Sequence, residues 1–119
     1  MTNFIIKRIK SVGYAFKGAV LLITTEASIK VQVFMSILVT LAGFYFNISS
    51  TEWLIQILTI GLIMSVEGVN TAIEKMADFI HPDFNDKIGF IKDIAAGAVF
   101  ISAIVAVIVA CIIYLPKIF

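Results

Sequence analysis

The residues whose types could do chemistry lie together in the segment 66–78, VEGVNTAIEKMAD. Its polar face consists of four residues separated by steps of three or four: Glu67, Asn70, Glu74 and Asp78. A helix places these side chains within one narrow arc. A carboxylate at membrane depth is costly unless it faces a cavity, a cation or a partner. Because this acidic face ends an apolar run, it indicates a functional site.

Further charged residues flank the apolar runs. Glu26 precedes the first run, and Lys92 with Asp93 precedes the last. Carboxylates gathered at a membrane boundary suit Mg²⁺, which binds through one or two carboxylates together with substrate phosphates. A nearby lysine could hold phosphate charge. The pattern predicts a cation and phosphate site, although Glu74 and Asp78 could also be only the solvated end of a helix.

The remaining motifs are weak. The segment 13–18 has the glycine spacing of a phosphate-binding loop, but its lysine precedes the second glycine, so we interpret it as helix packing. His81 has no Cys or His neighbour at zinc-ligand spacing, and a position at a helix end is its simpler interpretation. Cys111 is the only cysteine, which excludes an internal disulfide.

Composition defines the class of protein. Of the 119 residues, 61% are hydrophobic and only 14% are charged, a balance too apolar for an ordinary soluble domain. The net charge of +1 argues against nucleic-acid binding. We therefore expect an all-α integral membrane protein.

Uncharged runs predict where the chain crosses the membrane. The second run reaches the ~20 residues of a spanning helix only if it continues through Glu67 to about Ile80, which carries the acidic face past the hydrocarbon edge. The segment 47–51 is rich in helix N-cap residues and is followed by Glu52, which predicts a tight helical hairpin. The expected spans are residues 31–47, 53–80 and 94–115.

The segment 4–25 precedes the first span and mixes basic with apolar residues. This pattern is typical of an amphipathic helix that lies on the membrane surface. Basic residues are also found in the connection 81–93 and are absent from the hairpin, which predicts that the N-terminus and this connection face the cytoplasm. We expect a multi-pass protein of the plasma (inner) membrane, with a cytoplasmic site and the C-terminus outside.

Two segments resemble the family of small prokaryotic diacylglycerol and undecaprenol kinases. One runs from Glu67 to Asp78 and contains NTAIE; the other is KDIAAGAV, which begins at Lys92, fourteen positions after Asp78. These elements at this spacing are specific in a three-span chain, and Glu26 ahead of the first span adds to them. The resemblance implies an ATP- and Mg²⁺-dependent lipid kinase that assembles as a homotrimer of protomers, each with a surface helix and three spans.

The resemblance also implies a single lipid-kinase domain over residues 1–119 and roles for individual residues. Glu67 matches the general base of the family, and Asn70 matches an active-site asparagine. The positions that match its metal-binding carboxylates, and so contact the cofactor, are Glu26 and Glu74. The positions that match nucleotide-contacting residues are Tyr14, Asp83, Asn85, Lys92 and Asp93.

The acceptor is expected to be a lipid alcohol, either undecaprenol or diacylglycerol. NTAIE and KDIAAGAV look more like the undecaprenol branch, whereas Ser28 and Gln32 depart from the ExNxxxH pattern of that branch. A small oligomeric cation- or proton-coupled transporter is the alternative from another class. A transporter, however, usually places its carboxylate near mid-membrane rather than on one face. A purely structural membrane subunit, which would need only the packing glycines and alanines, is a further alternative.

Overall fold

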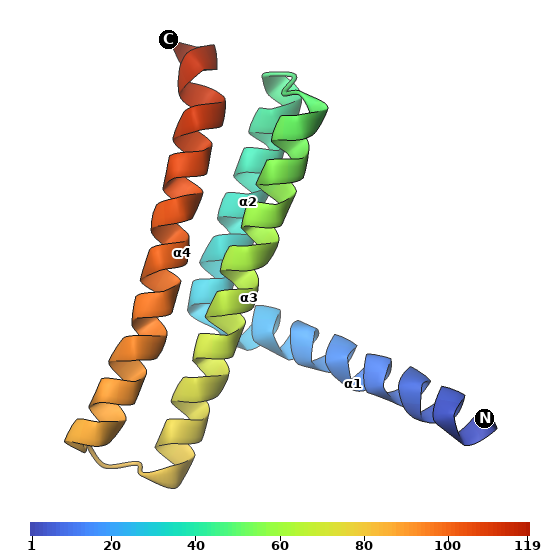
Figure 1. The fold of residues 1–119 in the computed structure, drawn as a ribbon, viewed down its shortest axis with the longest axis vertical. Coiled ribbons are helices and arrows are strands. Elements are labelled where there is room, and N and C mark those ends of the chain that lie inside the picture. The colour runs from blue at the N-terminus through green and yellow to red at the C-terminus, as the bar shows by residue number, and fades with distance from the viewer.

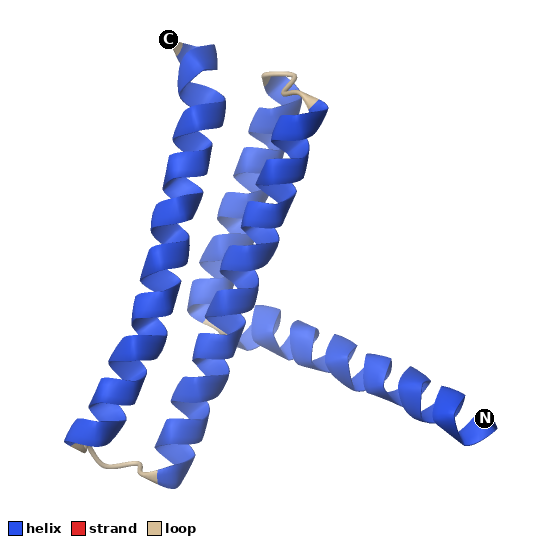
Figure 2. Ribbon diagram, in the orientation of Figure 1, coloured by secondary structure: helices blue, strands red, loops and turns tan.

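The computed structural model describes residues 1–119 and consists of four helices without strands (Figure 2). The helices are α1 (Thr2–Thr25), α2 (Ala27–Tyr45), α3 (Ser50–Ile80) and α4 (Asp86–Ile118). Helices α2, α3 and α4 are long and apolar enough to cross a membrane. The predicted all-helical architecture with three candidate spans is therefore confirmed.

Helices α2, α3 and α4 run side by side as a bundle, and α1 leaves the bundle at a wide angle (Figure 1). The α2–α3 turn and the C-terminus lie at one end, which we call the turn end (Figure 1). The α3–α4 connection, residues 81–85, lies at the opposite end, which we call the loop end. Consecutive spans are therefore antiparallel, and α1 joins the bundle closer to the loop end.

The interior of the bundle is small and contains many polar groups. Only 12 of 119 residues are buried, so most apolar side chains face outward, as lipid-exposed side chains do. The buried polar residues are Gln56, Glu67, Asn70, Thr71 and Ser102. A buried polar group is costly without a hydrogen-bonding partner. Each of these residues therefore needs a partner, within the chain or from a bound molecule.

The turn end is built as the sequence predicts. Asn47 adopts the left-handed conformation with φ 53°, which asparagine tolerates better than most residues. The Ser49 side chain accepts a hydrogen bond from the Glu52 amide, and the Glu52 carboxylate accepts one from the Ser49 amide at 2.9 Å. This capping box begins α3. Lys117 of α4 lies 3.0 Å from the same carboxylate, so the cap also connects α3 to α4.

A second polar contact at the turn end joins all three spans. The Tyr114 hydroxyl of α4 donates toward Gln56 Oε1 of α3 and lies 3.0 Å from the Val39 carbonyl oxygen of α2. Gln56 Nε2 donates to the same carbonyl at 3.2 Å. Hydrogen bonds between membrane helices contribute about 0.6 kcal/mol each on average. The turn end is therefore fixed by contacts that satisfy its buried polar groups.

At the loop end, α4 begins earlier than the expected span. The expected span starts at residue 94, whereas the helix starts at Asp86, directly after Asn85, whose side chain accepts a hydrogen bond from the Lys87 amide at 2.9 Å. The connection is thus residues 81–85 instead of 81–93. The charges that mark the edge of the apolar run lie inside the helix, so Lys92 and Asp93 are held on α4.

Gly43 permits the close approach of α2 to α3, and Gly43→Ala is expected to destabilise the bundle. A Cβ there would lie 2.6 Å from Trp53 Cη2, and a tryptophan ring cannot move aside without disturbing α3. Overpacking costs about 1–3 kcal/mol, against the roughly 1 kcal/mol by which alanine favours a helix over glycine. We expect a lower SDS concentration at the unfolding midpoint in mixed micelles.

Gly61→Ala is the matched control, because nothing lies within 4 Å of a Cβ at that position. Its unfolding midpoint should stay unchanged or rise. A Gly43→Ala midpoint equal to or above that of Gly61→Ala would contradict the prediction.

Candidate active site

The acidic face of α3 passes from the bundle interior to the solvated loop end. Glu67 and Asn70 are only 7% and 8% exposed. Glu74 is half-buried and Asp78 is exposed. The face predicted from residue spacing is therefore present on one continuous helix, and its carboxylates experience very different environments.

Asn70 and Glu74 form the hydrogen bond within this face. Asn70 Nδ2 donates to Glu74 Oε1 at 3.3 Å, which directs the amide oxygen of Asn70 away from the carboxylate. That oxygen, Oδ1, is buried and has no hydrogen-bond partner. A buried acceptor without a donor costs about 1–3 kcal/mol. The site therefore holds an oxygen that is suited to a hydroxyl, a water or a cation.

Glu67 is buried without a counter-ion. The ion pairs of the chain involve other carboxylates, those of Glu26, Glu52 and Asp78. The end of α1 packs against α3 at Gly68, the residue after Glu67, because a Cβ at Gly68 would lie 2.8 Å from Leu22 Cδ2. Glycine at this position thus lets the surface helix approach the site closely.

Glu26 occupies the junction between α1 and α2. Its backbone is extended, with φ −99° and ψ 119°, and it ends one helix and begins the next. Its carboxylate Oε1 lies 3.2 Å from Lys75 Nζ of α3. Lys75 directly follows Glu74 in the chain, so this ion pair connects the α1–α2 junction to the acidic face.

The remaining predicted residues lie at the loop end or on α1. Lys92 of α4 forms an ion pair with Asp78 of α3, which brings the predicted phosphate-binding lysine to the acidic face. Asp93 is exposed. His81 ends α3, and its Nδ1 lies 2.7 Å from the Asp83 carbonyl oxygen. Asn85 caps α4 through the contact described above.

Tyr14 is 73% exposed, in the middle of α1. No side-chain hydrogen bond or ion pair joins Tyr14 to the acidic face within one chain. The structure thus brings together Glu67, Asn70 and Glu74 on α3, with Glu26 and Lys92 attached through ion pairs. It does not bring three acidic or metal-binding side chains into one cluster.

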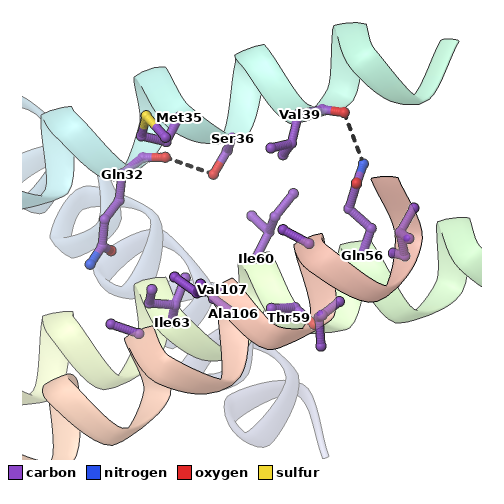
Figure 3. Close-up of a pocket in the computed structure, with 14 residues that line it drawn as sticks. Gln32, Met35, Ser36, Val39, Gln56, Thr59, Ile60, Ile63, Ala106 and Val107 are labelled. Atoms are coloured by element: carbon purple, nitrogen blue, oxygen red, sulfur yellow. Dashed lines mark hydrogen bonds between the residues drawn. The ribbon is translucent and has the colours of Figure 1, made fainter. Parts of the chain in front are cut away.

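Two cavities lie in the bundle, and a residue of the candidate site lines the first of them. One, of about 300 Å³, lies between α3 and α4 next to Asn70 and is otherwise almost entirely apolar. It is lined by Ser65, Val66, Val69, Asn70, Ile73, Ala95 and Ala98. The other, of about 280 Å³, lies between α2, α3 and α4 (Figure 3). Gln32 lines the second cavity and has a buried amide oxygen without a partner.

Sequence patterns missed two contacts. Nothing in the spacing of residues indicates that Lys75 pairs with Glu26, because the two positions belong to different elements and share no periodic pattern. The contact of Tyr114 with Gln56 was missed for the same reason. The signal that was available is a polar residue inside an uncharged run, since such a residue needs a partner in the membrane.

Comparison with known proteins adds to this geometry. Residues 13–114 match the family described as "Prokaryotic diacylglycerol kinase". The undecaprenol kinase of Bacillus subtilis (strain 168) is 35% identical over 108 residues, which cover 91% of this chain and 88% of the relative. The diacylglycerol kinase of Escherichia coli (strain K12) is 32% identical over 104 residues, covering 87% and 85%.

The fold defines a class, that of helical multi-pass membrane proteins. The chain belongs to the prokaryotic diacylglycerol kinase family. It is therefore a lipid kinase, of the diacylglycerol or undecaprenol kinase type, and membership of a kinase family implies ATP as the phosphoryl donor. The transporter and structural-subunit alternatives are set aside.

Proposed function

We propose that this lipid kinase transfers the γ-phosphoryl group of Mg·ATP to undecaprenol, with Glu67 as the general base. The observation that carries the proposal is the burial of Glu67 without a counter-ion. Its neighbours on α3, Val66 and Asn70, line the apolar cavity between α3 and α4. A general base must reach the proton that it removes and must not be neutralised by a neighbouring cation. The alcohol would lie between this carboxylate and the cavity, with its hydrocarbon chain toward the lipid.

Asn70 and Glu74 would hold the phosphate side of the site. The oxygens there are a half-buried carboxylate and an orphaned amide oxygen, and such oxygen donors fit a hard divalent cation. Glu26 supplies the second carboxylate, from the α1–α2 junction. Because no three acidic side chains converge, phosphate oxygens would complete the set. Mg²⁺, when bound, neutralises phosphate charge.

Lys92 would stabilise the negative charge of the phosphates. It is held on α4 by its ion pair with Asp78, so its ammonium group stays on the side of the acidic face. The other nucleotide contacts that we propose are Tyr14, Asp83, Asn85 and Asp93. Phosphoryl transfer depends mostly on positioning and electrostatic stabilisation. Placement of these groups would therefore supply most of the catalysis.

The preference for undecaprenol rests on the cavity between α3 and α4. Ala95 and Ala98 provide small side chains on the α4 side of this cavity, opposite the apolar Val66, Val69 and Ile73 of α3. An apolar cavity with one wall of small side chains would accommodate part of a long isoprenoid chain. The identity to the undecaprenol kinase, 35%, is only slightly above the 32% to the diacylglycerol kinase. The cavity, and not that difference, is the main support.

We also propose that the active form is a homotrimer with the N-terminus and the loop end in the cytoplasm. One protomer buries Glu67 and Asn70 but leaves Glu74 half-buried and Asp78 exposed, and α1 has no buried residue. Apolar side chains of α1 such as Phe4, Ile9 and Phe16 are 60–71% exposed, which suits contact with the membrane surface. The cytoplasmic side is where ATP is available.

Substitution of single carboxylates separates the base from the metal ligands. Glu67→Gln should lower kcat by about 10²- to 10⁴-fold, the usual contribution of general base catalysis, at every Mg²⁺ concentration and with nucleotide binding nearly intact. Glu26→Gln and Glu74→Gln should instead raise the Mg²⁺ concentration needed for half-maximal rate. The measurement is lipid phosphorylation with labelled ATP in mixed micelles.

Glu52→Gln is the matched control, because Glu52 is an ion-paired acid at the opposite end of α3. It should retain full activity. Equal loss of nucleotide affinity in the Glu67, Glu26 and Glu74 variants would show that the proposed division of roles is incorrect.

Competition between acceptors tests the substrate. Undecaprenol and diacylglycerol would be supplied to one enzyme preparation at equal mole fraction, and initial rates of formation of the two lipid phosphates compared. We expect undecaprenol to be preferred by less than about 200-fold, because apolar contacts discriminate weakly. A clear excess of phosphatidic acid would reverse the assignment of the acceptor and leave the lipid kinase activity in place.

Cross-linking and tag accessibility test assembly and orientation. In mild detergent, cross-linking should give a trimer, and in sealed vesicles of known orientation a protease site added at the C-terminus should be cut only from the outside. Cross-linked species that stop at the monomer, or cleavage only from the cytoplasmic side, would refute this part of the proposal.

A further inference from the structure

The ion pair between Lys75 and Glu26 is the contact at the candidate site that the proposed reaction does not use. Lys75 Nζ lies 3.2 Å from Glu26 Oε1, and the two side chains are 70% and 24% exposed. The lysine is therefore largely in solvent, whereas the carboxylate is partly enclosed at the α1–α2 junction. Exposed ion pairs contribute little to stability, so this one can be exchanged readily.

Lys75 also has a relation to each of the two proposed metal ligands. It follows Glu74 in the chain and pairs with Glu26, so its ammonium group is the cation that neutralises the Glu26 carboxylate. A divalent cation on Glu26 and the Lys75 ammonium group on the same carboxylate would repel each other at short distance. The two cations therefore compete for Glu26.

We propose that Lys75 is the resident counter-ion of Glu26 and is displaced when the divalent cation binds. Lys75 is thus a positioning residue: it holds the Glu26 carboxylate toward α3 in the free enzyme and lowers the affinity of the site for the metal. This inference rests on the proposed function, in which Glu26 is a metal ligand.

A purely structural role for Lys75 predicts the opposite effect. If the ion pair only fixes the α1–α2 junction against α3, its loss leaves Glu26 less well placed and weakens metal binding. If Lys75 competes with the metal, its loss strengthens metal binding. The sign of the change therefore separates the two roles.

The experiment measures binding of Mn²⁺ alone, without nucleotide, to the full chain in detergent micelles by electron paramagnetic resonance. Lys75→Gln is expected to bind Mn²⁺ about two- to fivefold more tightly than the wild type, the range that corresponds to an exposed ion pair. Lys75→Met should do the same and guards against a folding defect of the first variant. Lys75→Arg, which keeps the charge, should behave as the wild type. Unchanged or weaker Mn²⁺ binding in both neutral variants would overturn the inference.

Three further variants provide a charge control and distinguish this inference from the proposed function. Lys87 lies at the same end of the molecule and forms no ion pair. Lys87→Gln removes its positive charge and should leave Mn²⁺ binding unchanged. Glu26→Gln should weaken Mn²⁺ binding, and adding Lys75→Gln to it should then give no gain. If Glu26→Gln has no effect, the metal role of Glu26 fails and the inference fails with it. If Glu26→Gln weakens binding and the Lys75 variants do not strengthen it, only the inference fails.

Discussion

An unpartnered polar group is more costly in hydrocarbon than in water, and this cost governs both ends of the bundle. At the turn end every buried polar side chain has a partner: Tyr114 and Gln56 bond to each other and to the α2 backbone. Nearer the loop end, Glu67 has no counter-ion and Asn70 Oδ1 has no donor. The satisfied end connects the spans to one another, and the unsatisfied groups Glu67 and Asn70 are residues of the candidate site.

The charged residues follow the same division. The pair formed by Lys117 and Glu52 reinforces a helix cap and involves no residue of the candidate site. The pairs formed by Lys75 with Glu26 and by Lys92 with Asp78 each join two elements around the acidic face. Because exposed pairs contribute little to stability, the main effect of the pairs around the acidic face is to fix the positions of these charged side chains relative to α3.

Local patterns predicted much of this arrangement, and contacts between elements escaped prediction. The helical face of α3 follows from residue spacing, and the hairpin follows from cap residues such as Ser49, since both depend on neighbours in the chain. The sequence did not predict that α4 begins at Asp86. Charged residues such as Lys92 show where an apolar run begins, but a helix can extend beyond that point. The partner of Glu26 was missed because it lies on a separate helix. Side-chain pairs of this kind depend on the packing of whole helices.

The length of α3 has a consequence for how the protein relates to its bilayer. Its 31 residues extend roughly 46 Å at about 1.5 Å per residue, well beyond a hydrocarbon core of about 30 Å. Glu67 and Asp78 are consequently about 16 Å apart along one rigid rod. In the proposed reaction, the position of α3 along the membrane normal then sets the depth at which the lipid alcohol meets ATP. A bilayer of different thickness would shift that depth, so the lipid environment itself becomes a determinant of how well the two substrates meet.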